Sequence, residues 1–330
     1  MSQRVLVVRF GSLGDVILAG GAVQALRDQR GDALDVTFLV KEEYGELASL
    51  FCDDVWTLGP GVERETSSLG ELRNRIRAAG FHAVVDLQTS PRSRALLAGH
   101  PRVYRWNAAR WQRRRWVSLR WTKPAPVRPA WLRFVDALSP LGVQAALAKP
   151  PRFGVDPDQE APAEAKLAAW PGGAITFLAP GARWPTKRWP EERFLEAGRR
   201  IVARGGRVLI GGDASDRTAL PALDRWAQGE PAAHWYEGPL TGLVALLGHC
   251  ERAITNDTGL MHLAAAAGVR VTSVFGSTHP ALGFAPAGPG HRVLCAELSC
   301  QPCTLHGRER CPLGHHDCVR RIRVEQALED

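Results

Sequence analysis

The sequence predicts an α/β protein built from two doubly wound parallel sheets. Short apolar runs recur along the chain, several end in a glycine-bearing turn, and helical patterns follow the turns. Continuous apolar runs of this kind are typical of parallel strands that are buried on both faces. The alternation fades near residue 149 and restarts at residue 175, so we expect two similar domains with a cleft between them.

The first half supplies the elements of one such domain. A strand is expected over residues 4–9, which read RVLVVR, and it ends at the turn that runs from Gly11 to Gly14. A helix is expected from residue 16 to about residue 29. Further strands are expected at residues 36–40 and 83–87, because both segments are apolar and rich in β-branched residues.

A linker is expected between the halves, at about residues 149–173. Five prolines cluster there with acidic residues, around one short helical piece at residues 164–170. Such composition is typical of a segment between domains. The predicted boundary therefore separates an N-terminal domain, residues 1–160, from a C-terminal domain, residues 161–330.

The second half repeats the alternation. The expected strands and helices are strands 175–179, 207–210, 252–255 and 271–275 and helices 191–204, 240–247 and 259–267. Turns follow the strands at Pro180-Gly181 and Gly211-Gly212, and the loop 255–259 leads directly into a helix. Ligands bind at the carboxyl ends of strands in open parallel sheets, so these turns predict one functional edge, although any α/β fold also needs glycine turns.

Composition excludes several classes of protein. No run of 18 apolar residues occurs, so no transmembrane helix is expected, and Arg9 and Asp15 interrupt the N-terminal apolar stretch that a signal peptide would need. The seven cysteines are an odd number in a chain without a secretory signal, which argues against a disulfide framework. We expect a cytoplasmic protein.

Positive charge is concentrated in one segment. Residues 1–150 hold 22 Lys and Arg against 14 Asp and Glu, whereas residues 151–330 hold 20 of each. Between Asp86 and Asp136 there are 12 basic residues and no acidic one. Such a field attracts nucleic acid, acidic lipid head groups or phosphorylated glycans, and a solvated surface without a partner is the alternative.

Four tryptophans accompany these arginines, at positions 106, 111, 116 and 121. A spacing of five residues turns the helix by about 140° at each step, so the four rings do not share one helical face. We therefore expect an irregular basic and aromatic surface loop that meets anionic lipid head groups. A core role for some of the tryptophans is an equally good interpretation.

Common nucleotide-binding motifs are absent. The first turn lacks the G-x-G-x-x-G series, no Walker A motif occurs, and the second strand ends in Lys41 rather than an acidic residue. Three other segments, taken together, resemble glycosyltransferase family 9, the ADP-heptose:lipopolysaccharide heptosyltransferases. They are VLVVRFGSLGDVILAGGAVQALR, then APGARWPTKRWP with VLIGGDASDR, and ITNDTGLMHLAAAAGVRVTSVFGSTHP; the cysteine-bearing tail is also similar.

The resemblance implies two Rossmann-like domains of the glycosyltransferase-B type and an inverting transfer of heptose from ADP-heptose to the inner core of lipopolysaccharide. The N-terminal domain would bind the acceptor and the C-terminal domain the nucleotide sugar. No cofactor would be required, and Mg²⁺ would not be essential. We expect a monomer at the cytoplasmic face of the inner membrane. The alternatives are a family relative with another nucleotide sugar or glycan acceptor, and a polyanion- or nucleic-acid-binding protein. Nucleic acid is not the expected partner, because the second half is neutral and contains no nucleic-acid motif.

Two residues match the catalytic positions of the family. Asp15 matches the general base, which takes the proton of the acceptor hydroxyl, and a helix-capping aspartate is its structural alternative. Lys187 matches the lysine beside the leaving diphosphate, where a fixed cation offsets the developing charge. Residues assigned to the acceptor are Ser12, Gly14, Arg113, Arg114 and Arg115.

The donor would meet a second set of residues. The resemblance assigns to it Gly181, Arg183, Asp213, Asp257, Thr258, Gly259 and His262. Thr258 and Gly259 would offer N–H groups to the phosphates at a helix N-terminus, and His262 follows one turn later. A histidine on a helix is also a common structural residue. No metal site is assigned, because the tail spacing Cys300-x2-Cys303-x7-Cys311-x6-Cys318 fits zinc, a disulfide or reduced thiols.

Overall fold

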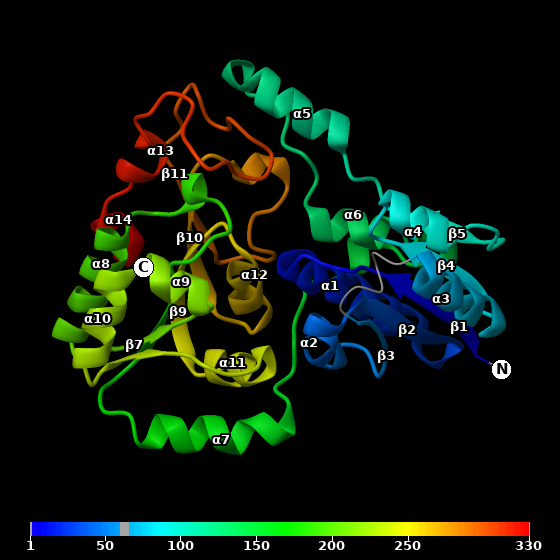
Figure 1. Ribbon diagram of the computed structural model, residues 1–330, viewed down its shortest axis with the longest axis horizontal. Coiled ribbons are helices and arrows are strands. Elements are labelled where there is room, and N and C mark those ends of the chain that lie inside the picture. Colours follow the sequence, from blue (N-terminus) through cyan, green and yellow to red (C-terminus); the bar gives the residue numbers. More distant parts are fainter. Residues whose placement is uncertain (1, 60–65, 330) are drawn as a thin grey trace. The chain divides into compact units, whose positions relative to one another are not determined.

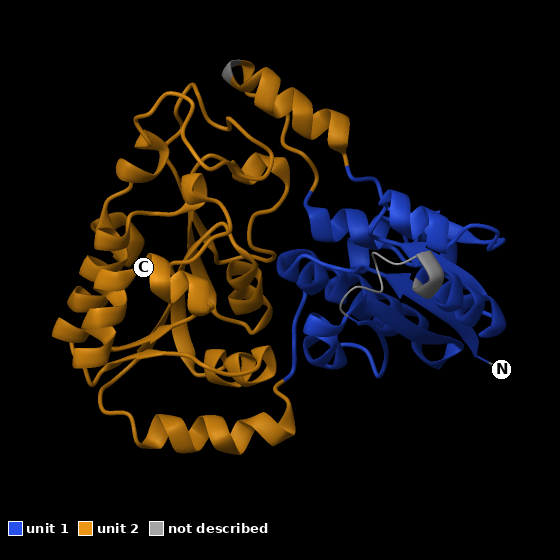
Figure 2. Ribbon diagram, in the orientation of Figure 1, with its two compact units in different colours: residues 1–108, 129–154 blue, residues 109–128, 155–330 orange. Residues whose placement is uncertain are grey.

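A computed structural model describes residues 2–59 and 66–329 of the chain. The chain forms two compact units (Figure 2). The first unit contains residues 1–108 and 129–154, and the second contains residues 109–128 and 155–330. Each unit has one parallel sheet with helices around it (Figure 1). This is the α/β class that the sequence predicts.

The first unit has a five-stranded sheet in the order β3-β2-β1-β4-β5. Its strands are β1 (Gln3–Val8), β2 (Leu34–Lys41), β3 (Asp54–Leu58), β4 (Ala83–Asp86) and β5 (Val103–Arg105). Its helices are α1 (Leu13–Arg30), α2 (Gly45–Ser49), α3 (Thr66–Ala78), α4 (Pro91–Leu96) and α6 (Ala130–Asp136). The middle strand β1 pairs with β2 on one side and β4 on the other, and its residues 5–8 are fully buried.

The second unit has a six-stranded sheet in the order β11-β10-β9-β6-β7-β8. Its strands are β6 (Ile175–Ala179), β7 (Arg207–Ile210), β8 (Ala233–Trp235), β9 (Cys250–Asn256), β10 (Arg270–Phe275) and β11 (Arg292–Cys295). Its helices are α5 (Arg110–Ser118), α7 (Pro157–Ala168), α8 (Glu191–Ala203), α9 (Ala214–Ala219), α10 (Pro221–Gly229), α11 (Leu240–Leu247), α12 (Gly259–Ala266), α13 (Asp317–Arg320) and α14 (Val324–Leu328). The strand order is that of a doubly wound sheet.

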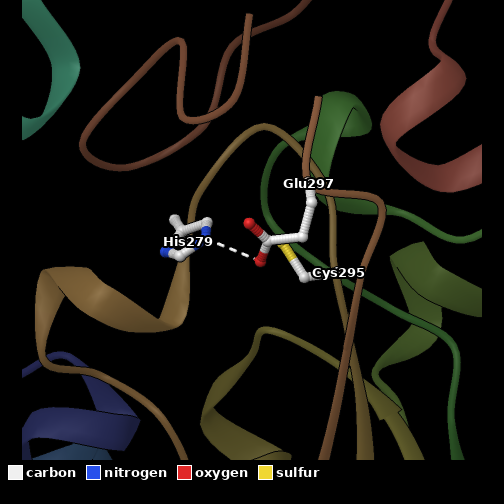
Figure 3. Close-up of side chains that lie close together, drawn as sticks. All are labelled: His279, Cys295 and Glu297. Atoms are coloured by element: carbon white, nitrogen blue, oxygen red, sulfur yellow. Dashed lines mark hydrogen bonds and ion pairs between the residues drawn. The ribbon is translucent and has the colours of Figure 1, made fainter. Parts of the chain in front are cut away.

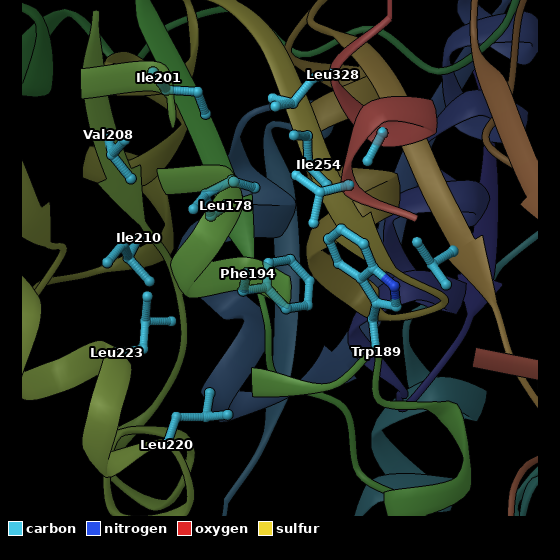
Figure 4. Packing of buried hydrophobic residues seen from close by; sticks show 14 of the residues in the cluster. Leu178, Trp189, Phe194, Ile201, Val208, Ile210, Leu220, Leu223, Ile254 and Leu328 are labelled. Carbon is cyan, nitrogen blue, oxygen red and sulfur yellow. The ribbon is translucent and has the colours of Figure 1, made fainter. Parts of the chain in front are cut away.

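The C-terminal tail completes the core of the second unit. Trp189 is almost fully buried; its ring lies against Phe194 at 5.1 Å between centroids, and its Nε1–H donates to the carbonyl of Ile322 at 3.0 Å. Figure 4 shows Leu328 beside Ile254 in the same cluster. Burial of these apolar side chains fixes the chain around residue 189, which positions the loop that precedes helix α8.

Three expectations about the middle of the chain differ from the structure. Residues 110–118, expected as an irregular loop, form helix α5. The whole segment 109–128 belongs to the second unit, although the predicted boundary near residue 160 placed it in the N-terminal domain. The expected linker also contains a longer helix, α7, which begins at Pro157 after the capping residue Asp156.

Two further expectations concern membrane-spanning helices and the cysteines. Among the described residues, no helix is long and apolar enough to cross a membrane. All seven cysteines lie in the described ranges and all are free thiols.

Candidate functional site

Each sheet has a switch point, where the strand order reverses and ligands of doubly wound folds bind. In the first unit it lies between β1 and β4, and in the second between β6 and β9. One residue predicted from the sequence as catalytic and one predicted to bind the donor follow these strands. Asp15 comes after β1, and Asp257 comes directly after β9.

In the first unit, Asp15 lies in the first turn of helix α1 and forms an ion pair with Arg9. Ser12, the N-cap residue of the helix, donates its hydroxyl hydrogen to the same carboxylate oxygen, at 3.2 Å. Ser12 makes no side-chain capping bond to the helix backbone. The carboxylate is therefore fixed by two side-chain partners and is not the helix cap.

Arg9 is held from several directions. Its guanidinium donates to the carbonyl of Leu87 at 2.6 Å and lies over the rings of Trp106 and Phe134, at 6.0 and 5.6 Å from their centroids. The side chain is buried, and buried guanidinium groups require such partners. Arg9 thus connects Asp15 to the loop that follows β4.

That loop is organised by Asp86, the last residue of β4. Its buried carboxylate accepts hydrogen bonds from the N–H of Thr89 at 2.8 Å and from the hydroxyl of Ser93 at 3.1 Å. Gln88 in turn accepts the N–H of Phe10 at 3.1 Å through its side-chain oxygen. Both strands at the switch point of this unit are therefore joined through hydrogen bonds beyond the sheet.

In the second unit, Lys187 and Asp257 form an ion pair with 2.9 Å between Nζ and Oδ2. Both side chains are largely buried, with 15% and 10% of their surface exposed. Thr278 also donates its hydroxyl hydrogen to Oδ2 of Asp257, at 2.7 Å. The lysine follows β6, the aspartate follows β9 and the threonine follows β10, so three neighbouring strands contribute to one cluster.

Asn256 holds the backbone around this cluster. Its side-chain oxygen accepts the N–H of Trp189 at 2.8 Å, and its side-chain amide donates to the carbonyl of Pro180 at 2.6 Å. The loop between β6 and helix α8 is therefore attached at both ends to the end of β9. This attachment fixes the position of Lys187, which lies between the two contacts.

The carboxylate of Asp216 lies beside Gly181, in the loop after β6. Asp213 and Asp216 form a capping box at the start of helix α9, each accepting a backbone N–H of the other. Hydrogen bonding from Ser215 is the main cause of the lowered pKa of Asp213, whereas burial raises the pKa of Asp216. An added Cβ on Gly181 would lie 2.2 Å from Oδ2 of Asp216, so any larger residue at this position would have to displace that carboxylate.

Of the remaining donor residues, Thr258, Gly259 and His262 lie at or near the start of helix α12, and Arg183 lies in the loop after β6. Thr258 is the N-cap residue of α12, but the Thr258 side chain makes no capping hydrogen bond, so the N–H groups of the first turn lack that partner. His262 lies one turn further on and is only 5% exposed. Arg183 is exposed near the ring of Trp184, at 5.4 Å from its centroid.

The three arginines assigned to the acceptor do not lie on one face of helix α5. Arg114 and Arg115 are exposed, whereas Arg113 is buried with its guanidinium over the ring of Phe284, 4.7 Å from the centroid. Arg113 therefore packs within the second unit, which corrects its assignment to an acceptor surface. The two tryptophans of this helix also point apart, since Trp111 is 69% exposed and Trp116 is 4% exposed.

Four residues of these clusters were missed in the sequence: Arg9, Asn256, Thr278 and Asp216. Arg9 was included in the first strand, although a charged residue at the carboxyl end of an apolar strand is itself a signal. The motif around Asp257 contains Asn256, but nothing in the motif shows that its amide connects two loops. Thr278 lies 21 residues beyond Asp257, so only the fold brings the two together.

Two α/β units, each with one doubly wound parallel sheet, are the architecture of the glycosyltransferase-B class of fold. The chain belongs to glycosyltransferase family 9: the family model described as glycosyltransferase family 9 (heptosyltransferase) matches residues 69–313. This confirms the resemblance found in the sequence.

Sequence and fold similarity to known proteins support the assignment to this family. The chain is 36% identical over 154 residues to lipopolysaccharide heptosyltransferase 1 of Pseudomonas aeruginosa, an alignment that covers 46% of the chain and 40% of that relative. The fold is similar to a family 9 glycosyl transferase from Veillonella parvula, with a TM-score of 0.80, 19% identity and 99% and 96% of the two chains covered. It is also similar to ADP-heptose lipopolysaccharide heptosyltransferase II of Escherichia coli, with a TM-score of 0.73, 18% identity and 98% and 96% covered.

Proposed function

We propose that this protein is an inverting heptosyltransferase that moves heptose from ADP-heptose to the inner core of lipopolysaccharide, at the cytoplasmic face of the inner membrane. ADP-heptose and lipopolysaccharide are proposed as substrates because they appear in the names of proteins similar to this chain. The observation that carries the proposal is the Lys187–Asp257 pair, which lies at the switch point of the second unit, directly before the N-terminus of helix α12.

The second unit would bind the donor. A diphosphate suits the start of α12, because the free N–H groups of a helix N-terminus and its dipole favour negative charge. Lys187 would offset the charge that develops on the diphosphate as it leaves. Asp257 and Asp213 would accept hydrogen bonds from sugar and ribose hydroxyls. Since Lys187 supplies a positive charge, the proposal does not require a catalytic metal ion.

The first unit would supply the base. The acceptor hydroxyl oxygen forms a bond to the anomeric carbon while the bond from that carbon to the phosphate oxygen breaks, and ADP leaves. Asp15 takes the hydroxyl proton in this step. Arg9 and Ser12 would orient its carboxylate, because both already contact the same oxygen.

The test is an assay of ADP release with ADP-heptose and deacylated core acceptors that end in Kdo or in heptose. The proposal expects release with at least one acceptor, and release that is about 10²–10⁴ slower with the Asp15→Asn variant. Release with another nucleotide sugar alone would identify a family relative of different donor specificity. Absence of release with every acceptor, in a protein that binds ADP, would contradict the proposed acceptor.

A further inference from the structure

We propose that one face of helix α5 docks the protein on an anionic phospholipid bilayer, and that the donor unit carries this helix. The inference deepens the membrane location proposed above and rests on it. The outer face of α5 is defined here as Trp111, Arg114, Arg115, Ser118 and Leu119, and the inner face as Ala109, Arg113 and Trp116.

Helical spacing and burial define the two faces. Positions 114 and 115 follow position 111 by three and four residues, and position 118 and the C-cap position 119 follow position 115 by three and four, so all five share one side. All five are exposed, and Trp111 is 69% and Leu119 36% exposed, two of the few large apolar side chains exposed among the described residues. The outer face therefore combines exposed apolar side chains with two arginines.

The inner face attaches the helix to the second unit. The ring of Trp116 stacks on His279 at 5.2 Å between centroids, and its Nε1–H donates to the carbonyl of Ala125 at 3.0 Å. Trp116 also joins Ala109, Val127 and Leu282 in one buried cluster. At the other end of the segment, Lys123 forms an ion pair with Glu297, 2.9 Å from Nζ to Oε2.

The group formed by His279, Cys295 and Glu297 belongs to this attachment (Figure 3). Three such residues side by side are also a candidate metal site. However, Nδ1 of His279 accepts the N–H of Ala281, so the proton of the neutral ring is on Nε2, which donates to Glu297 at 3.2 Å. Lys123 occupies the other oxygen of Glu297, and burial raises the pKa of the Cys295 thiol to about 11. Both ring nitrogens of His279 and both oxygens of Glu297 therefore already have partners, one of which, Lys123, belongs to the segment 109–128.

The chemistry of the outer face selects a bilayer. Arginine side chains pair with lipid phosphates, while tryptophan is favoured at the level of the head groups and leucine just below it. No acidic residue lies between Asp86 and Asp136 to oppose the attraction. The exposed Leu119 favours lipid over single-stranded nucleic acid, because bases stack on aromatic side chains and not on an aliphatic one.

The test uses the full-length protein and vesicles of phosphatidylglycerol and phosphatidylcholine that contain no glycolipid. Co-sedimentation should increase with the phosphatidylglycerol fraction and decrease with salt. The double variant Arg114→Gln/Arg115→Gln should bind about 30-fold more weakly at low salt, at about 1 kcal/mol for each basic residue near the surface. Trp111→Ser should weaken binding at low and high salt alike, because burial of an apolar ring is not screened.

Matched controls lie on the same unit and on the other unit. Arg204→Gln/Arg225→Gln removes the same charge from exposed positions at the end of α8 and on α10, which lie far from α5 in Figure 1. Leu147→Ser removes another exposed apolar side chain. Both controls should bind vesicles as the wild type does. If the control double variant lost as much vesicle affinity as Arg114→Gln/Arg115→Gln, net charge alone would explain the binding, and the proposal would be overturned.

Two further results would also overturn it. One is no binding to vesicles that contain phosphatidylglycerol at low salt. The other is loss of oligonucleotide binding in the outer-face variants without loss of vesicle binding, which would make this face a nucleic-acid surface. Because the vesicles contain neither donor nor acceptor, the result is independent of the transferase assay, and either proposal can fail alone.

Discussion

Lys187 and Asp257 are paired across 2.9 Å although they belong to loops that follow different strands. Asp257 has a second fixed partner in Thr278, and Asn256 holds the loop that carries the lysine. The lysine is therefore positioned before any ligand binds, which is the condition under which a charge stabilises a transition state most effectively.

The first prediction follows from this arrangement. Lys187→Ala should lower turnover by an amount equivalent to about 2–4 kcal/mol, the range for removal of one preorganised charge partner. Steady-state ADP release measures the effect, and Lys166→Ala, which removes an exposed lysine from α7, is the control. An unchanged rate with a lower melting temperature would assign Lys187 to structure alone.

Asp15→Asn should leave donor affinity close to that of the wild type and reduce turnover by about 10²–10⁴, as expected for loss of a general base. Donor affinity is measured by calorimetry and turnover by ADP release. The matched control is Asp28→Asn, an exposed aspartate on the same helix. Turnover within threefold of the wild type would remove Asp15 from the mechanism.

His262→Ala should weaken the binding of ADP, because the histidine is one turn beyond Thr258 on helix α12. Calorimetric titration with ADP is the measurement. The exposed His249→Ala serves as control for loss of an imidazole. Since His262 is buried, melting temperatures are needed as well: identical ADP affinity with reduced stability would make it a structural residue.

Gly181→Ala should destabilise the protein by about 1–3 kcal/mol, because the new methyl group would overlap the carboxylate of Asp216. Urea unfolding measures the change. Gly229→Ala, at the end of α10 with no atom within 4 Å of the added carbon, should instead stabilise by up to about 1 kcal/mol. In the double variant Gly181→Ala/Asp216→Ala, the loss of unfolding free energy should be smaller than the sum of the losses in the two single variants. A loss equal to that sum would show that the overlap with Asp216 does not cause the destabilisation.

The basic helix gives a prediction that separates its arginines. Arg114→Gln/Arg115→Gln should raise the KM for the lipid-linked acceptor and flatten its dependence on salt, while the KM for the donor is unchanged. Arg113→Gln should instead lower the melting temperature, because its guanidinium packs on Phe284. A changed donor KM with an unchanged acceptor KM would place the exposed pair near the nucleotide.

The apolar strands at the centre of each sheet could be predicted from the sequence. The expected strand 175–179 coincides with β6, and the expected helix 240–247 coincides with α11, because an uninterrupted apolar run leaves few alternatives. The short strands β3, β5, β8 and β11 were missed. They are edge strands, and their residues are only partly buried, so the apolar signal is weak.

In the candidate site, too, some residues could be predicted from the sequence and others could not. Asp15, Lys187 and Asp257 were found because they belong to contiguous motifs. Their partners Arg9 and Thr278 were not, since an ion pair or hydrogen bond between distant segments leaves no local pattern. The place of α5 could not be predicted either, because the stack of Trp116 on His279 joins residues far apart in the sequence.

Residues 109–128 belong to the second unit although they lie in sequence between two segments of the first, and this affects how chimeras of family members should be designed. The chain passes from one unit to the other after residues 108, 128 and 154, so it crosses three times rather than once. A chimera of two family members joined near residue 155 would give the second unit of one parent the basic helix of the other. Substrate preferences should transfer intact only when residues 109–128 are exchanged together with residues 155–330.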